Sequence, residues 1–514
     1  MQSKRWLEAF MAANRWLEVA AGLLTVCFCS PETLAETARP NVLFIAVDDL
    51  RPELGAYGAN TVTPNLDQLA ATGMRFDRAY CQQAVCGASR LSIMTSLYPT
   101  YTGEQTFHVT NWRDRHPEVV TLNQHLRGHG YHTVGLGKIY HQRRGKEVDL
   151  ANWDEWIDVW APDYALAENR DILEKALAES KGHDSRNPPK GPTAESAEVP
   201  DDGYCDGIRA QRAAELLRDL ANQPETPFFF AVGFVKPHLP FNAPAKYWRL
   251  YERDAFQMPP NAAIPPGYPA GAANLDAGEM KQYSDYEGTK PTDFSDALNR
   301  RLLHGYAAAT SYVDACVGQV LDSLQAAGLA DNTIVVLWGD HGWKLGDHSS
   351  WCKHTNFECD TRVPLIVRDP RTQSTGSTSQ VVELIDLYPT LCELTGVPTP
   401  VHCQGRSFRQ LLSDPTDAHR QDAYSSYPYG DESIGHSIRF GRYRYTEWWK
   451  KESQEVEARV LTDLQADPGE VTNVANDPEH ADALDRGVER LRVRVRAALR
   501  EKVRDPQPTT TRGG

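Results

Sequence analysis

Four long apolar runs recur along the chain, and ionisable residues follow each of them. The runs occupy residues 41–47, 132–137, 227–235 and 333–338. A run without alternating polar positions is typical of a strand that is buried on both faces, as in a parallel sheet. Helical apolar spacing lies between the runs, at residues 63–72, 122–129, 208–220 and 300–327. Strands that alternate with helices predict an α/β fold with a large, mostly parallel, doubly wound sheet between helices.

The pattern changes beyond residue 386. Residues 437–445 alternate and predict a hairpin strand, and residues 460–464 predict another. A terminal helix is indicated by apolar residues at positions 484, 488, 491, 495 and 499. We therefore predict a large α/β domain over residues 36–415 and a smaller C-terminal α+β subdomain over residues 416–514, which ends in a frayed tail.

Two polar segments rich in Pro and Gly interrupt the large domain, at residues 161–203 and 258–296. Segments of this length without regular structure are usually functional lids or disordered insertions. Trp153, Trp156 and Trp160 lead into the first of them. Tryptophan in a loop suits stacking on sugar rings, and packing beneath the loop explains these residues equally well.

The N-terminus has the pattern of an export signal. Basic residues precede a short apolar run at residues 19–29, and a small-residue cleavage site follows at Ala35. The run is too short to span a bilayer, so we predict a signal peptide over residues 1–35 and a periplasmic or secreted protein, with an anchoring helix as the alternative. No later segment predicts a stable membrane span.

Charge and cysteine content narrow the function further. The chain has 514 residues and a formal net charge of −15, which argues against nucleic acid as a partner. An anionic substrate would therefore need a local cationic pocket. Ten cysteines are present, and export would permit disulfides. Cys392 and Cys403 flank a Gly/Pro turn and are the predicted pair.

The ionisable residues after the four apolar runs are candidates for one site. Ligands of open α/β sheets bind outside the carboxyl ends of the strands, so these side chains are expected to converge. They include Asp48 and Asp49, Lys138 and His141, Lys236 and His238, and Asp340 and His341. Carboxylates supply hard oxygen ligands for a divalent cation such as calcium. An imidazole is softer, which leaves magnesium and transition metals open.

One cysteine lies in an unusual setting. Cys86 is surrounded by small residues, Arg90 follows four positions later, and a helical apolar run begins at Leu91. A cysteine at the start of a helix and near a guanidinium is expected to favour its thiolate. From the spacing alone, a buried structural cysteine explains Cys86 equally well.

The stretch Cys86-Gly87-Ala88-Ser89-Arg90 resembles the C-x-P/A-x-R signature of type I sulfatases, although Ala88 stands where most members have Pro. Residues 82–85 are similar to the iduronate-2-sulfatase branch. Further blocks look like the family's, in the family's order, at residues 47–51, 137–141, 236–240, 339–357 and 461–470. The resemblance implies the alkaline-phosphatase-like fold and hydrolysis of a sulfate ester on a sugar or polysaccharide, with a 2-O-sulfated uronic acid as the substrate that this branch suggests.

The resemblance also implies roles for individual residues. A formylglycine-generating maturation enzyme would oxidise Cys86, and the hydrated aldehyde would attack sulfur and form a covalent sulfate ester. The metal, most often calcium in this family, would be held by Asp48, Asp49, Cys86, Asp340 and His341. Arg90 and Lys138 would hold the diol, His141 would act as base, and His238 would protonate the leaving alcohol. Lys236 or Lys353 would contact the sulfate, with Lys353 the better match.

Two alternatives remain at this point. A phosphomonoester or phosphonate hydrolase of the same fold would act on an ester of the same shape. A catalytically silent glycan-binding relative would keep Cys86 unmodified.

Overall fold

The computed structural model describes residues 39–109, 112–141, 149–180, 188–263, 265–269, 271–275, 278–372 and 374–500. The predicted signal peptide, residues 1–35, and the predicted tail, residues 506–514, lie outside these ranges. The described residues from Pro40 onward form one compact unit.

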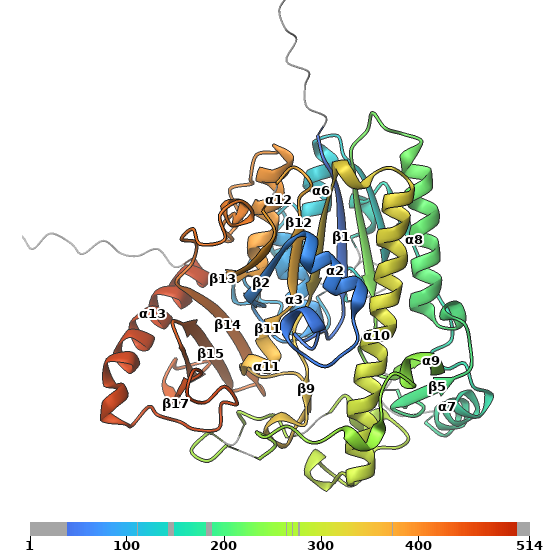
Figure 1. Ribbon diagram of the computed structural model, residues 1–514. Coiled ribbons are helices and arrows are strands. Elements are labelled where there is room, and N and C mark those ends of the chain that lie inside the picture. Colours follow the sequence, from blue (N-terminus) through green and yellow to red (C-terminus); the bar gives the residue numbers. More distant parts are fainter. Residues whose placement is uncertain are drawn as a thin grey trace, which may run out of the picture. The chain divides into compact units, whose positions relative to one another are not determined.

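Nine strands of the described chain form one large sheet (Figure 1). They are β1 (Asn41–Val47), β2 (Met74–Tyr80), β3 (His132–Gly137), β4 (Glu155–Ile157), β6 (Phe228–Phe234), β8 (Thr333–Gly339), β11 (Arg362–Val363), β12 (Leu365–Arg368) and β13 (Gly376–Glu383). Their order is β11-β2-β12-β8-β1-β6-β3-β4, and β13 also pairs with β2. All four predicted apolar strands are present, and they are parallel neighbours in the order β8, β1, β6 and β3.

Strand β1 shows why its sequence carries no polar alternation. Leu43, Ile45 and Val47 pack on one face of the sheet against helices α2 (Pro64–Thr72), α8 (Cys205–Ala221) and α10 (Asp296–Ala326). Val42 and Phe44 pack on the opposite face against helices α3 (Cys86–Thr95), α6 (Leu122–Gly128) and α12 (Leu387–Thr395). Both faces are covered by helices, so every position of the strand is buried, and every position after Asn41 is apolar.

The helices confirm the predicted spacing and add several short elements. They are α2 (Pro64–Thr72), α3 (Cys86–Thr95), α4 (Pro99–Thr102), α5 (Trp112–Arg115), α6 (Leu122–Gly128), α7 (Ala167–Glu179), α8 (Cys205–Ala221), α9 (Ala245–Trp248), α10 (Asp296–Ala326), α11 (Glu358–Thr361), α12 (Leu387–Thr395) and α13 (Ala481–Leu499). Within the described ranges, no helix combines the length and the apolar character that crossing a membrane requires.

The sheet is more mixed than the strand pattern suggested. Strand β12 runs antiparallel to both β8 and β2, and β11 runs antiparallel to β2. Strand β2 was not predicted, because its sequence M-R-F-D-R-A-Y buries only some positions and carries charge on the others. The α/β fold class is confirmed, with antiparallel pairs on one side of the parallel centre.

The first polar segment is not structureless. It contains α7 and strand β5 (Ala194–Ala197), which pairs in parallel with β7 (Phe241–Pro244). Glu195 accounts for part of this order, because its carboxylate accepts hydrogen bonds from the backbone nitrogens of Ala165 and Leu166 at the start of α7. The expectation that residues 161–203 lack regular structure is therefore wrong for this part of the segment.

The C-terminal sheet is antiparallel, in the order β14 (Asp422–Tyr429), β15 (Ser433–Phe440), β16 (Tyr443–Lys450) and β17 (Val456–Asp463). The predicted strand over residues 437–445 in fact spans the turn between β15 and β16, where Gly441 has a φ of 49°. Helix α13 packs Leu491 and Val495 against Ile438 and Tyr445 of this sheet.

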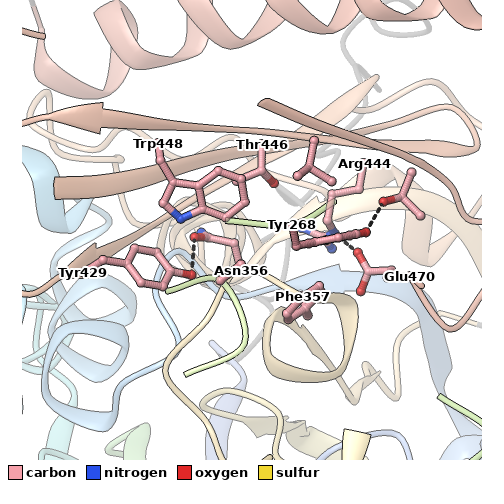
Figure 2. Close-up of a pocket in the computed structure, with 11 residues that line it drawn as sticks. Tyr268, Asn356, Phe357, Tyr429, Arg444, Thr446, Trp448 and Glu470 are labelled. Carbon is pink, nitrogen blue, oxygen red and sulfur yellow. Dashed lines mark hydrogen bonds and ion pairs between the residues drawn. The ribbon is translucent and has the colours of Figure 1, made fainter. Parts of the chain in front are cut away.

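A small pocket shows how the C-terminal sheet contacts earlier segments (Figure 2). The Tyr268 and Thr462 hydroxyls lie 2.8 Å apart, and the Tyr429 hydroxyl lies 3.4 Å from the Asn356 side chain. Arg444 forms an ion pair with Glu470 at 3.0 Å. These polar contacts hold the residue 268 and residue 356 segments on one face of the sheet.

The predicted disulfide is wrong, because Cys392 and Cys403 are both free. Cys392 lies inside α12 and packs in the core beneath the sheet, and Cys403 packs against the same cluster. Both thiols therefore serve as apolar packing groups, a common use of cysteine.

Arg420 neutralises two buried carboxylates and provides a stability test. Its guanidinium lies 2.8 Å from Asp386 and 3.1 Å from Glu383, and all three side chains are almost fully buried. Removing the cation in Arg420→Met leaves the carboxylates without this partner. We expect the free energy of unfolding in urea to fall by about 3–5 kcal/mol. In Arg212→Met, the control, an exposed pair with Glu215 is lost, and we expect about 1 kcal/mol or less.

The same pair predicts a pH dependence. Burial raises the pKa of Asp386, but Arg420 and His419 outweigh it and hold the pKa well below the usual value of 3.8. A carboxyl group whose pKa is lower in the folded state than in the unfolded state stabilises the fold at pH values above the unfolded-state pKa. This stabilisation is lost as the pH falls through the folded-state pKa. The difference in the free energy of unfolding between wild type and Arg420→Met should therefore become smaller below about pH 4. A difference that widens on acidification would contradict this assignment.

Candidate active site

Strand register brings the predicted residues to one edge of the sheet. Val47 of β1 pairs with Gly339 of β8, so Asp48 and Asp340 leave neighbouring strands at the same level. On the other side, the Asp48 nitrogen donates to the Phe234 carbonyl at the end of β6. The Lys138 nitrogen donates to the carbonyl of Gly233 in turn. The predicted convergence of four strand ends is confirmed.

Arg90 links two of these strand ends. Its guanidinium lies 2.9 Å from a carboxylate oxygen of Asp48 and 2.9 Å from one of Asp340, and all three side chains are fully buried. Lys138 forms an ion pair with the other oxygen of Asp48. A buried carboxylate without such partners would be very costly. Arg90 and Lys138 therefore fix the carboxylates in place.

Cys86 is the first residue of α3, and Arg90 lies one turn further along the same helix. Residues four apart share a helix face, so the contact that fixes Arg90 also fixes residue 86. Gly87 allows this helix start to lie close to the chain, since a Cβ there would come within 2.1 Å of the Phe107 carbonyl oxygen. Packing therefore requires the glycine at position 87 of the motif.

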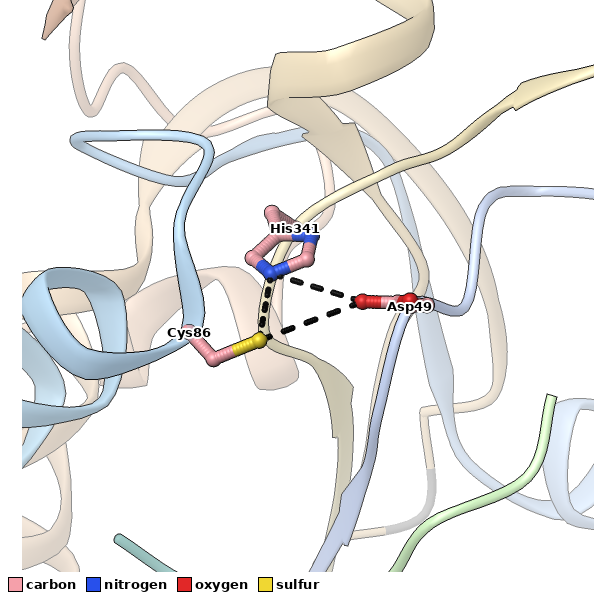
Figure 3. A group of neighbouring side chains, drawn as sticks. All are labelled: Asp49, Cys86 and His341. Atoms are coloured by element: carbon pink, nitrogen blue, oxygen red, sulfur yellow. Dashed lines mark hydrogen bonds and ion pairs between the residues drawn. The ribbon is translucent and has the colours of Figure 1, made fainter. Parts of the chain in front are cut away.

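The Cys86 sulfur lies among the metal-ligand candidates (Figure 3). Sγ is 3.1 Å from Nε2 of His341, 4.0 Å from Asp49 and 3.9 Å from the Lys138 ammonium. Burial, followed by the charge of Asp48, raises the pKa of Cys86 well above its usual range. The prediction of a favoured thiolate is therefore wrong, because burial and the carboxylates outweigh the helix end and the guanidinium.

His341 is oriented by its own neighbour. Its Nδ1 lies 2.9 Å from the Gly342 carbonyl oxygen, which can only accept a hydrogen bond. In the neutral ring the proton is therefore on Nδ1, and the Nε2 lone pair faces Cys86 and the carboxylates of Asp49 and Asp340, each at 3.5 Å. A backbone carbonyl that fixes the tautomer in this way is typical of a histidine that binds a metal.

Lys353 reaches the same cluster from a strained turn. It follows β10 (Trp351–Cys352), and the residues on either side of it, Cys352 and His354, have left-handed φ values of 68° and 86°. Its fully buried ammonium lies 2.9 Å from Asp49 and 3.1 Å from Glu279. Strained backbone of this kind tends to occur where a side chain must be aimed accurately.

Glu279 was not anticipated from the sequence. It lies in the second polar segment, and its carboxylate lies 2.7 Å from Nε2 of His238 as well as close to Lys353. The Nδ1 of His238 lies 2.6 Å from the Leu239 carbonyl, so both ring nitrogens face oxygen acceptors. Burial lowers the pKa of His238, and Glu279 opposes that shift. No residue pattern around position 279 marks it as part of a site.

His141 lies nearby with a different character. Burial, followed by the charge of Lys138, lowers its pKa to about 2, so the ring is neutral. Its Nδ1 is buried without a hydrogen-bond partner among the described residues, and its ring lies 5.5 Å from that of Phe107. A neutral imidazole with an unused nitrogen can accept a proton.

Lys236 and the tryptophans make contacts of another kind than the ion pairs of the charged cluster. The Lys236 ammonium donates to the carbonyls of His238 and Pro240, which shapes the loop after β6. Trp153 is buried and stacks on Phe229, and Trp156 packs against it. Trp160 is 67% exposed. The packing explanation therefore holds for the first two tryptophans.

The donor set fits a hard divalent cation. Ligand atoms of Asp49, Cys86 and His341 lie within 4.8 Å of one another, as do those of Asp48, Cys86 and Asp340. Burial raises the pKa of Asp49 to about 7, while Lys353 lowers it and Asp48 raises it. Such crowding of buried carboxylates is relieved when a cation binds. Asp48, Asp49 and His238 form a third such group, which the sequence did not suggest.

Comparison with known proteins agrees with this geometry. Residues 40–397 match the family described as Sulfatase, and residues 346–497 match the family described as N-sulphoglucosamine sulphohydrolase, C-terminal. The chain is 31% identical to iduronate 2-sulfatase of Mus musculus, over 91% of this chain and 98% of the mouse protein.

Solved structures show the same fold at lower identity. One is BT4656 in complex with its substrate D-glucosamine-2-N,6-O-disulfate, with a TM-score of 0.70 and 21% identity over 90% of this chain and 99% of that chain. Another is the phosphonate monoester hydrolase of Agrobacterium radiobacter, with a TM-score of 0.69 and 22% identity over 89% of this chain and 96% of that chain.

Glu279 provides a test of the site. In Glu279→Gln the carboxylate that joins His238 to Lys353 is replaced by a neutral amide of the same shape. We expect kcat to fall by about 10- to 100-fold, the usual effect of losing a partner that orients a functional group. Steady-state kinetics on a chromogenic sulfate ester measures this change.

Glu287→Gln is the matched control, because Glu287 lies in the same segment and accepts from the backbone nitrogen of Ser295 at the start of α10. We expect its kcat to stay within about two-fold of wild type, as for surface changes remote from chemistry. Equal kinetics for the two variants would show that Glu279 does not orient His238 and Lys353.

Proposed function

Because this chain belongs to the sulfatase family, it hydrolyses sulfuric esters, and we propose that its substrate is a sulfate ester on a sugar, in particular a 2-O-sulfated uronic acid. The observation that carries the proposal is the position of Cys86, 3.1 Å from His341 and beside Asp49 and Lys138. The relative named iduronate 2-sulfatase, which the chain matches over nearly its whole length, supports the substrate class.

We propose that Cys86 is converted to formylglycine by a maturation enzyme. Hydrated formylglycine would supply a hydroxyl nucleophile at this position, and a second hydroxyl that allows the aldehyde to re-form. The unmodified thiol is poorly suited to the task, because burial keeps its pKa well above the usual range. The Sγ atom occupies the place that the oxygens of the modified residue would take.

Two cations and one neutral base are assigned roles in the reaction at residue 86. Arg90 and Lys138 hold the carboxylates and keep positive charge beside the nucleophile, since the Lys138 ammonium is 3.9 Å from Sγ. His141 is neutral and has a buried nitrogen without a partner among the described residues. We assign to it the removal of the proton from the second hydroxyl.

His238 and Lys353 complete the site on the substrate side. His238 faces Glu279 through Nε2, and we assign to His238 the protonation of the leaving sugar oxygen, because an alkoxide leaves poorly. Lys353 has its buried ammonium in the cluster and is assigned to the sulfate oxygens. Lys236 is assigned a positioning role, since its ammonium bonds two carbonyls of the loop that carries His238.

A divalent cation, most simply calcium, would be held by Asp48, Asp49, Asp340 and His341 together with modified residue 86. When bound it would polarise a sulfate oxygen and draw negative charge away from the ester. The three carboxylates and the oriented imidazole support this assignment.

We also propose that the protein is exported and acts in the periplasm or outside the cell. The basic start and the short apolar run at residues 19–29 support this location.

The mass of the tryptic peptide Ala79–Arg90 tests the modification. The peptide contains Cys81 as well as Cys86, so Cys81 is an internal control. In protein made together with a formylglycine-generating enzyme, we expect one alkylated thiol and one aldehyde that reacts with a hydrazide. Two alkylated thiols, with a known sulfatase converted in the same cells, would contradict the proposal.

Activity on paired esters tests the reaction. The converted protein should release sulfate from 2-O-sulfated uronic acid and from an aryl sulfate, and Cys86→Ala should release neither. Faster hydrolysis of the matching phosphate or phosphonate ester would favour that alternative activity. Binding of the sulfated sugar without turnover would favour a silent glycan-binding protein.

A further inference from the structure

A cavity of about 130 Å³ opens beside the proposed site. Lys138 and His238 line one part of it, and the Lys138 ammonium is the group that lies 3.9 Å from the Cys86 sulfur. The position of the cavity makes it the natural place for the part of a substrate that surrounds the sulfate ester.

Four potential cations line the cavity beside apolar side chains, and three of the four already have partners. Lys138 is paired with Asp48, and His238 with Glu279. The Lys236 ammonium donates to two backbone carbonyls. These three groups therefore have little charge left for a second anion on the substrate.

Lys190 is the exception. Its ammonium lies 3.4 Å from the Tyr283 hydroxyl and 4.9 Å from the centre of that ring. Within the part of the chain that the structure describes, no carboxylate forms an ion pair with it. Its backbone is nevertheless held in place, since the Lys190 nitrogen donates to the Gln282 carbonyl at 2.7 Å. A half-buried ammonium without an anionic partner is suited to bind one from outside.

The charge of Lys190 also acts on Glu279, the carboxylate that contacts His238 and Lys353. Burial has the largest effect on the pKa of Glu279 and raises it. The charges of Lys353 and His238 lower this pKa, and the charge of Lys190 lowers it further by a smaller amount. Tyr283, the residue that Lys190 contacts, lies four positions after Glu279 in the same segment. Lys190 thus lies on the wall of the cavity next to the group that orients His238.

We propose that Lys190 binds a second anionic group on the same sugar, either a carboxylate or another sulfate. This inference rests on the proposed sugar sulfatase function and adds the residue that selects for a doubly charged substrate. Asp163, the carboxylate that lines the cavity, is exposed and is available to accept hydrogen bonds from sugar hydroxyls. The cavity would then favour an acidic or disulfated sugar over a neutral sugar that bears one sulfate.

The test compares substrates that differ in the second charge alone. For the converted holoenzyme and Lys190→Met, kcat/KM is measured on a 2-O-sulfated uronic acid, on its methyl ester and on 4-nitrophenyl sulfate. We expect the acid-to-ester ratio of kcat/KM to fall about 10- to 100-fold in Lys190→Met, mainly through KM, because a hydrogen bond to a charged group is lost. Lys190→Arg should restore most of the ratio, since it keeps the charge.

A second arm identifies the anion. The ratio of kcat/KM is also measured for D-glucosamine-2-N,6-O-disulfate relative to a monosulfated glucosamine. If Lys190→Met lowers this ratio but leaves the acid-to-ester ratio of the uronic acid unchanged, the anion that Lys190 binds is a sulfate. Lys175→Met is the matched control, since Lys175 lies on α7 of the neighbouring segment and its side chain is 78% exposed. Its ratios should equal those of wild type.

Three outcomes would overturn the proposal. An equal loss on all substrates would show that Lys190 acts structurally, and a lowered melting temperature of Lys190→Met would accompany it. Unchanged ratios would show that Lys190 does not contact the substrate. Hydrolysis of 4-nitrophenyl sulfate by wild type without hydrolysis of any sulfated sugar would show instead that the proposed substrate class has failed.

Discussion

The buried charge cluster at the ends of β1 and β8 is the constraint on which the rest of the site depends. Asp48, Asp49 and Asp340 are completely buried, and carboxylates in that position are tolerated only with close cations. Arg90 contacts two of them, and it comes from the helix that begins with Cys86. The need to neutralise the carboxylates therefore also sets the position of residue 86. One interaction fixes the ligand candidates and the proposed nucleophile together.

The sheet supplies the accuracy that this cluster requires. Strands β8, β1, β6 and β3 are parallel neighbours with continuous register, so their ends lie at one level. Helices cover both faces, so the strands are buried among apolar side chains. In such surroundings electrostatic interactions are stronger than in water. The surrounding segments, which carry Glu279, Lys190 and Lys353, then add the groups that would select and orient a substrate.

Much of this could be predicted from the sequence, and the failures have physical reasons. The four apolar runs predicted the central strands, because burial on both faces leaves a clear pattern, and their polar ends predicted the cluster. Strand β2 was missed, since a strand with charged, partly buried positions resembles a loop in sequence. Glu279 and Lys190 were missed because they belong to irregular segments, where long-range contacts alone decide which side chain reaches the site. The thiolate of Cys86 was wrongly expected, because local helix geometry said nothing of how deeply the residue is buried.

The most direct test of the account is whether the group at position 86 attacks the sulfur. In Cys86→Ser a single hydroxyl replaces the diol, so attack would leave a sulfate ester that no second hydroxyl can expel. The measurement is the mass of the peptide Ala79–Arg90 from Cys86→Ser after incubation with an aryl sulfate. We expect sulfate bound covalently to residue 86. An unmodified peptide from the folded variant would contradict it.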